Sequence, residues 1–251
     1  MTLRNHLPGY SSPTYPRAPL RWPSPEHPAA GVQWWWPDEG KVRVRKLLSR
    51  AAMRPIYRFA SLKMGRSIHL ESALEHQVAM LLDACPTVEA FGEQPVTLEF
   101  ETGTGAARHI PDFAVSHRGH PWFLEVKYSK DVDSTCLQRT QRLVDLLAPL
   151  GIEYRLITEK DLPLQPRLSN AWALLQRGRR TVPPHLSLMT YQRVLSSPGI
   201  TLGELEWASP LIAASLAGDL MQGRLHTDLG KTLTLESPIL ASQTEGNWLW
   251  A

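Results

Sequence analysis

Apolar residues in the middle of the chain recur first at a helical period and then at a strand period. The helical part begins at Ser67, and its apolar stripe consists of Leu70, Leu74, Val78 and Leu81. Spacings of three and four residues place these side chains on one face of a helix, which can then pack on a sheet. We therefore predict a helix that begins at Ser67 and ends before Pro86.

After this helix, apolar and polar residues alternate as they do in strands, and turns that contain glycine separate these segments. The predicted elements, in order, are strands at 96–101, about 107–115 and 121–128, a helix at 135–149 and a strand at 153–158. A helix, three meandering strands, a second helix and a further strand predict an α/β core with a mixed sheet.

Changes in composition divide the chain into four parts. They are a Pro/Trp-rich and basic N-terminal arm (1–66), the α/β domain (67–165), a second domain (166–240) and a C-terminal tail (241–251). The density of proline in the arm favours extended chain. The tryptophan run at 34–36 is expected to dock on the protein's own surface or on a partner.

The second domain follows a different pattern from the first. Helices are predicted at about 186–197 and 210–222, with a short helix that opens at Thr201 between them. A pair of short β segments bounded by glycine comes next. Three helices followed by two β segments predict a winged-helix-like α+β domain.

The composition of the 251 residues permits a packed core, since 43% are hydrophobic and 20% are charged. Cys85 and Cys136 lie far apart, which indicates a reducing cytoplasm and argues against a disulfide framework or a zinc site. We find neither a signal peptide nor an apolar run that could span a membrane.

The net charge of +3 conceals an asymmetry along the chain. Residues 1–66 hold 12 Lys and Arg against 3 Asp and Glu, whereas residues 67–165 hold 8 against 15. An acidic centre beside a basic leader fits a metal-binding core with an arm that binds a polyanion, although a solvated basic helix explains the leader equally well. The second domain is nearly neutral, which favours docking to a partner over strong DNA binding of its own.

Three charged residues stand within apolar surroundings in the segment HIPDFAVSHRGHPWFLEVKYSKD, residues 109–131. Alternation along the strand places Glu125 and Lys127 on one face, roughly 7 Å apart, and Asp112 on the preceding strand can lie opposite them. Carboxylates bind Mg²⁺, and a lysine can position a water or stabilise charge on a phosphate. The alternative is an exposed pair on a solvated sheet face.

A third acid is expected from the helix. Glu75 lies beside the apolar stripe and is well placed to reach the sheet, and Glu71, one turn earlier on the same face, is the alternative. The order of helix with Glu, Pro-Asp, Glu-x-Lys and second helix is that of the PD-(D/E)xK restriction-endonuclease-like core.

Five segments of the chain together resemble a known family. They are SALEHQVAMLL, FGEQPV, HIPDFAV, FLEVKYSKD and YRLITEKDL, in this order. They are similar to TnsA, the endonuclease subunit of heteromeric Tns-type transposases. The resemblance covers residues 67–162 and extends more loosely into the winged-helix-like part.

The resemblance implies which residues form the site. Glu75, Asp112 and Glu125 become the metal-facing acids, Lys127 becomes the catalytic lysine, and the backbone carbonyl of Val126 becomes a further metal ligand.

Other residues are expected near this site. Gln94 matches a family position and either supports the site or makes an ordinary hydrogen bond at a strand end. Basic residues expected to contact DNA are Arg45, Lys46, Arg50 and Lys130.

The resemblance further implies a Mg²⁺-dependent DNA endonuclease, with Mn²⁺ able to substitute and one or two ions bound. It would cleave the 5′ (non-transferred) strand at transposon ends in cut-and-paste transposition, in the cytoplasm of a bacterium. Its expected partners are double-stranded DNA, a DDE transposase subunit (TnsB-like) and an AAA+ ATPase regulator (TnsC-like). Two alternatives are a stand-alone restriction- or repair-type nuclease and a non-catalytic DNA-binding regulator.

Overall fold

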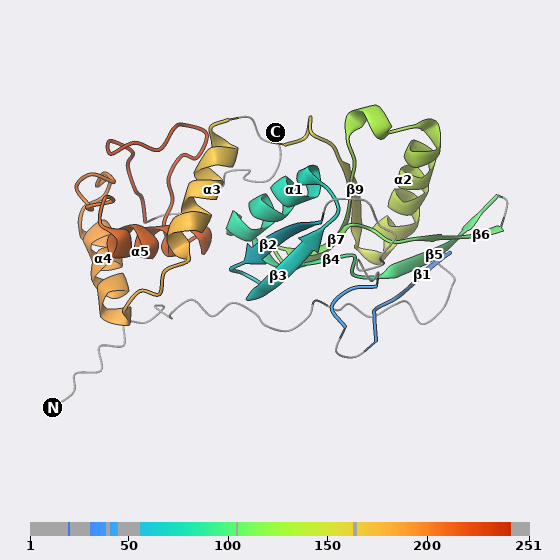
Figure 1. Cartoon of the computed structure of the whole chain (residues 1–251), viewed down its shortest axis with the longest axis horizontal. Coiled ribbons are helices and arrows are strands. Elements are labelled where there is room, and N and C mark those ends of the chain that lie inside the picture. Colours follow the sequence, from blue (N-terminus) through green and yellow to red (C-terminus); the bar gives the residue numbers. More distant parts are fainter. Residues whose placement is uncertain are drawn as a thin grey trace. The chain divides into compact units, whose positions relative to one another are not determined.

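The computed structural model describes residues 20, 31–38, 41–44, 56–103, 105–162 and 165–241. It divides into two compact units, one built mainly from residues 16–83 and 87–164 and the other mainly from residues 165–248 (Figure 1). Arg45, Lys46 and Arg50, with most of the N-terminal arm and nearly all of the C-terminal tail, lie outside the described residues. No helix in the described part of the chain combines the length and the apolar character that a membrane span requires.

The described part of the first unit contains nine strands and two α-helices. The strands are β1 (Val32–Trp35), β2 (Tyr57–Ser61), β3 (Arg66–Leu70), β4 (Val88–Glu93), β5 (Thr97–Thr102), β6 (Gly105–His109), β7 (Phe113–His117), β8 (His120–Val126) and β9 (Glu153–Ile157). The helices are α1 (Ala73–Ala84) and α2 (Ser134–Leu147), with short 3-10 turns η2 (Ser129–Asp131) and η3 (Ala148–Leu150).

A four-stranded sheet in the order β4-β7-β8-β9 forms the centre of this unit. Its first three strands pair antiparallel, whereas β8 and β9 pair in parallel. Parallel neighbours need a crossover connection, and α2 provides it. The predicted α/β fold with a mixed sheet is therefore confirmed.

Both faces of this sheet are covered. Phe113, Ala114 and Val115 follow one another along β7 and are all fully buried, although consecutive side chains of a strand point to opposite faces. The face that carries Ala114 and Phe123 packs against α2, which begins after Asp133, whose side chain accepts a hydrogen bond from the main-chain N of Cys136 at 2.7 Å.

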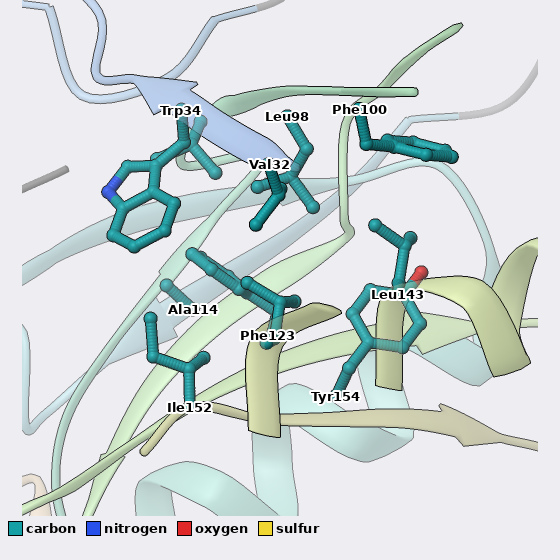
Figure 2. Close-up of a cluster of buried hydrophobic side chains, with 11 residues drawn as sticks. Val32, Trp34, Leu98, Phe100, Ala114, Phe123, Leu143, Ile152 and Tyr154 are labelled. Atoms are coloured by element: carbon teal, nitrogen blue, oxygen red, sulfur yellow. The ribbon is translucent and has the colours of Figure 1, made fainter. Parts of the chain in front are cut away.

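A second sheet, in the order β1-β5-β6, completes this core. Trp34 of β1 is 3% exposed and meets Phe123 edge to face, with 6.1 Å between the ring centroids (Figure 2). The sequence boundary at residue 66 is therefore wrong for β1. Residues 32–35 pair with β5 and contribute to the core, because Val32 and Trp34 alternate inward as strand residues do.

The predicted start of the first helix is also wrong. Residues 66–70 form β3, which pairs with β2, and the helix begins at Ala73. Leu70 matches the helical spacing but lies on a strand. The turn between β2 and β3 is held by the buried carboxylate of Asp83 in α1, which accepts hydrogen bonds from Ser61 Oγ and from the main-chain N of Lys63.

Two further differences concern strands. The single strand predicted at 107–115 is divided at Pro111 into β6 and β7, which belong to different sheets, because proline lacks the N–H that a sheet ladder needs. Strand β4, which has no clean alternation of apolar and polar residues, was not predicted.

The described part of the second unit contains α3 (Arg167–Gly178), α4 (Pro184–Ser196) and α5 (Pro210–Met221). Helix α3 was not predicted, and the short helix predicted at Thr201 is a series of turns. The two predicted β segments appear only as isolated bridges, Thr201–Pro238 and His226–Leu240. The winged-helix assignment is therefore not confirmed.

Replacing Trp34 by Ala is expected to destabilise the protein by about 3–5 kcal/mol, because a buried aromatic side chain leaves a cavity that its neighbours cannot fill. Urea denaturation followed by circular dichroism measures this change. The neighbouring Trp35 is 48% exposed, so Trp35→Ala is the matched control and should alter the stability by less than about 0.5 kcal/mol. Equal effects of the two substitutions would contradict the placement of β1 in the core.

Candidate functional site

A cavity of about 480 Å³ lies at the carboxyl end of β8. It brings together residues from the N-terminal end of α1, from the bend before β7, from the end of β8 and from η2. The charged side chains that line it are Glu71, Glu75, Asp112, Glu125, Lys127 and Asp131. All of the predicted acids, the lysine and Val126 therefore line one cavity, together with the alternative Glu71 and with Asp131, which the sequence analysis did not select.

Strand β8 and the bend before β7 position the central residues. The main-chain N of Lys127 donates to the carbonyl of Ile157 at 2.9 Å, so pairing with β9 continues to the lysine. Asp112 lies in the bend that precedes β7 and not within a strand as predicted. Its Oδ2 accepts a hydrogen bond from the main-chain N of Val126 at 2.7 Å, which fixes this carboxylate beside the end of β8.

Glu75 lies in the first turn of α1 and also caps this helix. Its main-chain N donates to Oγ of Ser72 at 3.1 Å, and its Oε2 accepts from the main-chain N of Glu71 at 2.9 Å. This reciprocal arrangement is similar to a capping box. A carboxylate near a helix N-terminus is also stabilised by the helix dipole. The sequence SALE therefore gives Glu75 a structural role as well as a place in the cavity.

Glu125 is held by two cationic or polar side chains. Its Oε1 lies 3.0 Å from Nη2 of Arg139 in α2, and its Oε2 lies 3.0 Å from Nε2 of His109 at the end of β6. The same His109 nitrogen lies 3.0 Å from the hydroxyl oxygen of Tyr154. Arg139 was not selected from the sequence, although its spacing from the buried Cys136 and Leu143 places it on the face of α2 that packs on the sheet.

Gln94 makes hydrogen bonds to the acidic cluster. Its Nε2 donates to Oε1 of Glu71 at 2.7 Å, and its main-chain N donates to the carbonyl of Asp112 at 2.8 Å. Gln94 thus connects two parts of the cavity wall without lining the cavity itself. Lys130 lies 5.9 Å from the ring centroid of the exposed Tyr128.

The crowding of carboxyls changes how they ionise. Burial, followed by repulsion from Glu125 and Glu75, raises the pKa of Asp112 well above its ordinary value, and the hydrogen bond from Val126 opposes this shift only in part. Burial is also the main cause that raises the pKa of Glu75. Like charges therefore face one another here and would be relieved by a cation.

The donor set fits a hard divalent cation. Carboxylate and carbonyl oxygens are the ligands that Mg²⁺ and Mn²⁺ prefer. Among the described residues, no three His, Cys, Asp or Glu side chains form a ready-made metal site. Glu75, Asp112 and Glu125 each accept a hydrogen bond from a donor within the chain.

Comparison with known protein families gives a match over the part of the chain that holds most of this site. Residues 85–159 match a family model described as TnsA-like endonuclease N terminal. These residues are similar to the N-terminal domain of TnsA-like endonucleases. The resemblance stated from the sequence is thus confirmed for a region that contains Asp112, Glu125 and Lys127, whereas Glu75 lies outside the TnsA-like match.

The other comparisons add little to the TnsA-like match. No curated protein matches the chain. The crystal structure of protein VC1899 from Vibrio cholerae is 22% identical over 39% of this chain, with a TM-score of 0.25. The chain covers 27% of the length of that protein.

Replacing Asp112 by Asn is expected to stabilise the metal-free protein at neutral pH. Because the folded pKa of Asp112 is raised, the folded state binds more protons than the unfolded chain above the ordinary value of 3.8, so stability falls as the pH rises from there toward the folded pKa. Asn keeps the oxygen that accepts from Val126 and removes the charge. Urea denaturation in EDTA should show a gain for Asp112→Asn at pH 7 that disappears below about pH 4.

The matched control is Asp145→Asn, since Asp145 lies on the solvent-exposed side of α2 and its change should leave the pH profile unaltered. An Asp112→Asn protein that is less stable than the wild type at pH 7 and in EDTA would contradict the assigned repulsion.

Proposed function

We propose that the first unit is a divalent-metal-dependent DNA endonuclease that hydrolyses the 5′ (non-transferred) strand at transposon ends. The observation that carries this proposal is the meeting of Glu75, Asp112, Glu125 and Lys127 in one cavity, within a region whose larger part is TnsA-like. Cut-and-paste transposition by a Tn7-type complex is the process in which such a cut would serve.

Glu75, Asp112, Glu125 and the carbonyl of Val126 would hold Mg²⁺, or Mn²⁺ in its place. A bound divalent cation supplies Lewis acidity toward the phosphate oxygens and toward the attacking water. The chain itself supplies preorganisation. Arg139 and His109 orient Glu125, and Val126 orients Asp112, so these two acids are fixed before a substrate arrives.

Lys127 is a cationic side chain in the lining of this cavity. Its main chain is anchored to β9, and its side chain lines the cavity. An ammonium group here can donate to a non-bridging oxygen of the scissile phosphate and stabilise the charge that develops in the transition state. It can also orient the attacking water by hydrogen bonding.

Lys127→Ala is expected to lower the rate of strand cleavage at least 100-fold, because it removes a charge-stabilising donor from the transition state. The assay follows 5′-strand cleavage of end-containing DNA with Mg²⁺ and the partner transposase present. The control, Lys160→Ala, removes an exposed lysine of the same unit and should cleave at the wild-type rate.

The partner's 3′-end joining should continue with Lys127→Ala, which shows that the complex still assembles. Wild-type 5′ cleavage by this variant would refute the proposed role. Cleavage by the wild-type chain alone, without a partner, would instead favour a stand-alone nuclease.

The second unit is proposed to dock a protein partner of the transposition complex, such as a DDE transposase or an AAA+ ATPase. Its described part exposes several large apolar side chains, namely Trp172, Met189, Leu195, Leu211 and Leu235. Exposed apolar groups favour protein contacts, whereas the near-neutral charge of this part disfavours strong DNA binding. Its relation to a winged-helix domain stays a prediction.

Met189→Lys is expected to weaken association with the docked partner by about tenfold or more, because Met189 is 62% exposed and a lysine would place a charge in an apolar contact. A pull-down with purified transposase and with purified ATPase, each in turn, measures this loss. His185→Lys in the same helix is the control, since His185 is exposed and polar already. Unchanged association with both partners would contradict docking through α4.

A further inference from the structure

A second cavity, of about 790 Å³, lies between the β5–β6 hairpin and α2. In Figure 1 this hairpin extends beyond the four-stranded sheet beside α2. The polar side chains that line the cavity are Arg108, Arg139, Arg142, Thr102, Thr135 and Gln138. The described residues of its lining include no acid, so its charge is opposite to that of the cavity at the end of β8.

Two of the three arginines, Arg108 and Arg142, retain charge and donors for a ligand, whereas Arg139 is paired with Glu125. Arg142 donates from Nε to the main-chain carbonyl of Glu101 at 3.2 Å, a neutral acceptor, and no carboxylate of the described residues forms an ion pair with it. Arg108 donates from Nε to Glu99 at 2.6 Å, but its side chain is 77% exposed, and such exposed ion pairs are weak. A guanidinium has five N–H groups, so each of these bonds uses only part of its capacity.

The lining suits a phosphodiester strand. Guanidinium groups match the oxygens of phosphates in a two-pronged geometry, and the hydroxyl of Thr135 and the amide of Gln138 add neutral donors of the kind that contact DNA backbones. Arg139 and Arg142 are three residues apart on α2, so they are neighbours on the helix surface.

We propose that this basic cavity binds backbone phosphates of the DNA beside the site of cleavage. The inference rests on the function proposed above and deepens it, since it names the surface that holds the substrate. Arg139 connects the two places, because it lines the basic cavity and also bonds to Glu125 in the acidic one. The strand that lies in the basic cavity therefore continues toward the carboxylates and Lys127.

The test measures binding of the full chain to a fluorescein-labelled DNA duplex by fluorescence anisotropy over a range of NaCl concentrations, in EDTA so that cleavage does not interfere. Arg108→Gln and Arg142→Gln should each weaken binding and lower the slope of log K against log salt by about 0.9, the value for one lost phosphate contact on duplex DNA. Glu99→Gln should act in the opposite direction and tighten binding, because it removes the carboxylate that competes for Arg108.

Two controls make the result specific. Arg118→Asn removes an arginine from the turn between β7 and β8, at the opposite end of β8 from Glu125, and Asn tolerates the positive φ of 51° at this position, so binding should stay unchanged. Arg142→Lys keeps the charge and should keep the wild-type salt slope. Thermal melting of every variant shows whether the fold is intact.

Unchanged affinity and slope in folded Arg108→Gln and Arg142→Gln proteins would overturn the proposal. Displacement of the duplex by inorganic phosphate beyond that by chloride at equal ionic strength would support it, since free phosphate would then compete with the backbone phosphates for the same cavity. Binding through these arginines by a wild-type chain that never cleaves would support the cavity and contradict the endonuclease function. Cleavage that depends on Lys127, with all arginine variants binding normally, would contradict the cavity alone.

Discussion

The mutual repulsion of carboxylates at the carboxyl end of β8 is the constraint that organises the first unit. Burial is the main cause that raises the pKa of Asp112 and of Glu75, and repulsion from Glu125 adds to each shift. Ionised groups in such a place need donors close by, because an unpaired buried charge is strongly destabilising. The fold supplies donors to each acid: a main-chain N–H to Asp112, a main-chain N–H and the Ser72 hydroxyl to Glu75, and two side chains to Glu125.

These donors come from elements that are far apart in the sequence, which explains why the sheets and helices must meet as they do. His109 ends β6, and β6 is held by β5, whose other edge pairs with β1. Arg139 is carried by α2, which packs on the central sheet through Leu143 and Leu147. The apolar core shown in Figure 2 and the polar cavity therefore depend on the packing of the same strands and helix. Loss of the core would remove the partners of Glu125 as well as hydrophobic burial.

The parts of the site that depend on local pattern could be predicted from the sequence. Alternation along β8 places Glu125 and Lys127 on one face, and helical spacing places Glu75 beside the stripe of α1. The contacts of Arg139 and His109 depend on how β6 and α2 pack against β8. The spacing of apolar residues along one element does not predict such packing. Leu70 shows the opposite error, because its spacing from Leu74 fits a helix although pairing with Tyr57 holds it in a strand.

A cluster of acids also creates a difficulty for any enzyme whose substrate is a polyanion. Residues 67–165 hold 15 acidic against 8 basic residues, so the net charge of the region opposes the approach of DNA. Attraction must therefore come from local grouping of the cations and not from their number. Arg108, Arg139 and Arg142 are such a grouping, gathered by a hairpin and a helix that the sequence separates by about 30 residues. The ion pair between Arg139 and Glu125 lies where the two opposite charges meet, so in the proposed binding mode the basic cavity would offset the repulsion between a phosphate strand and the acids.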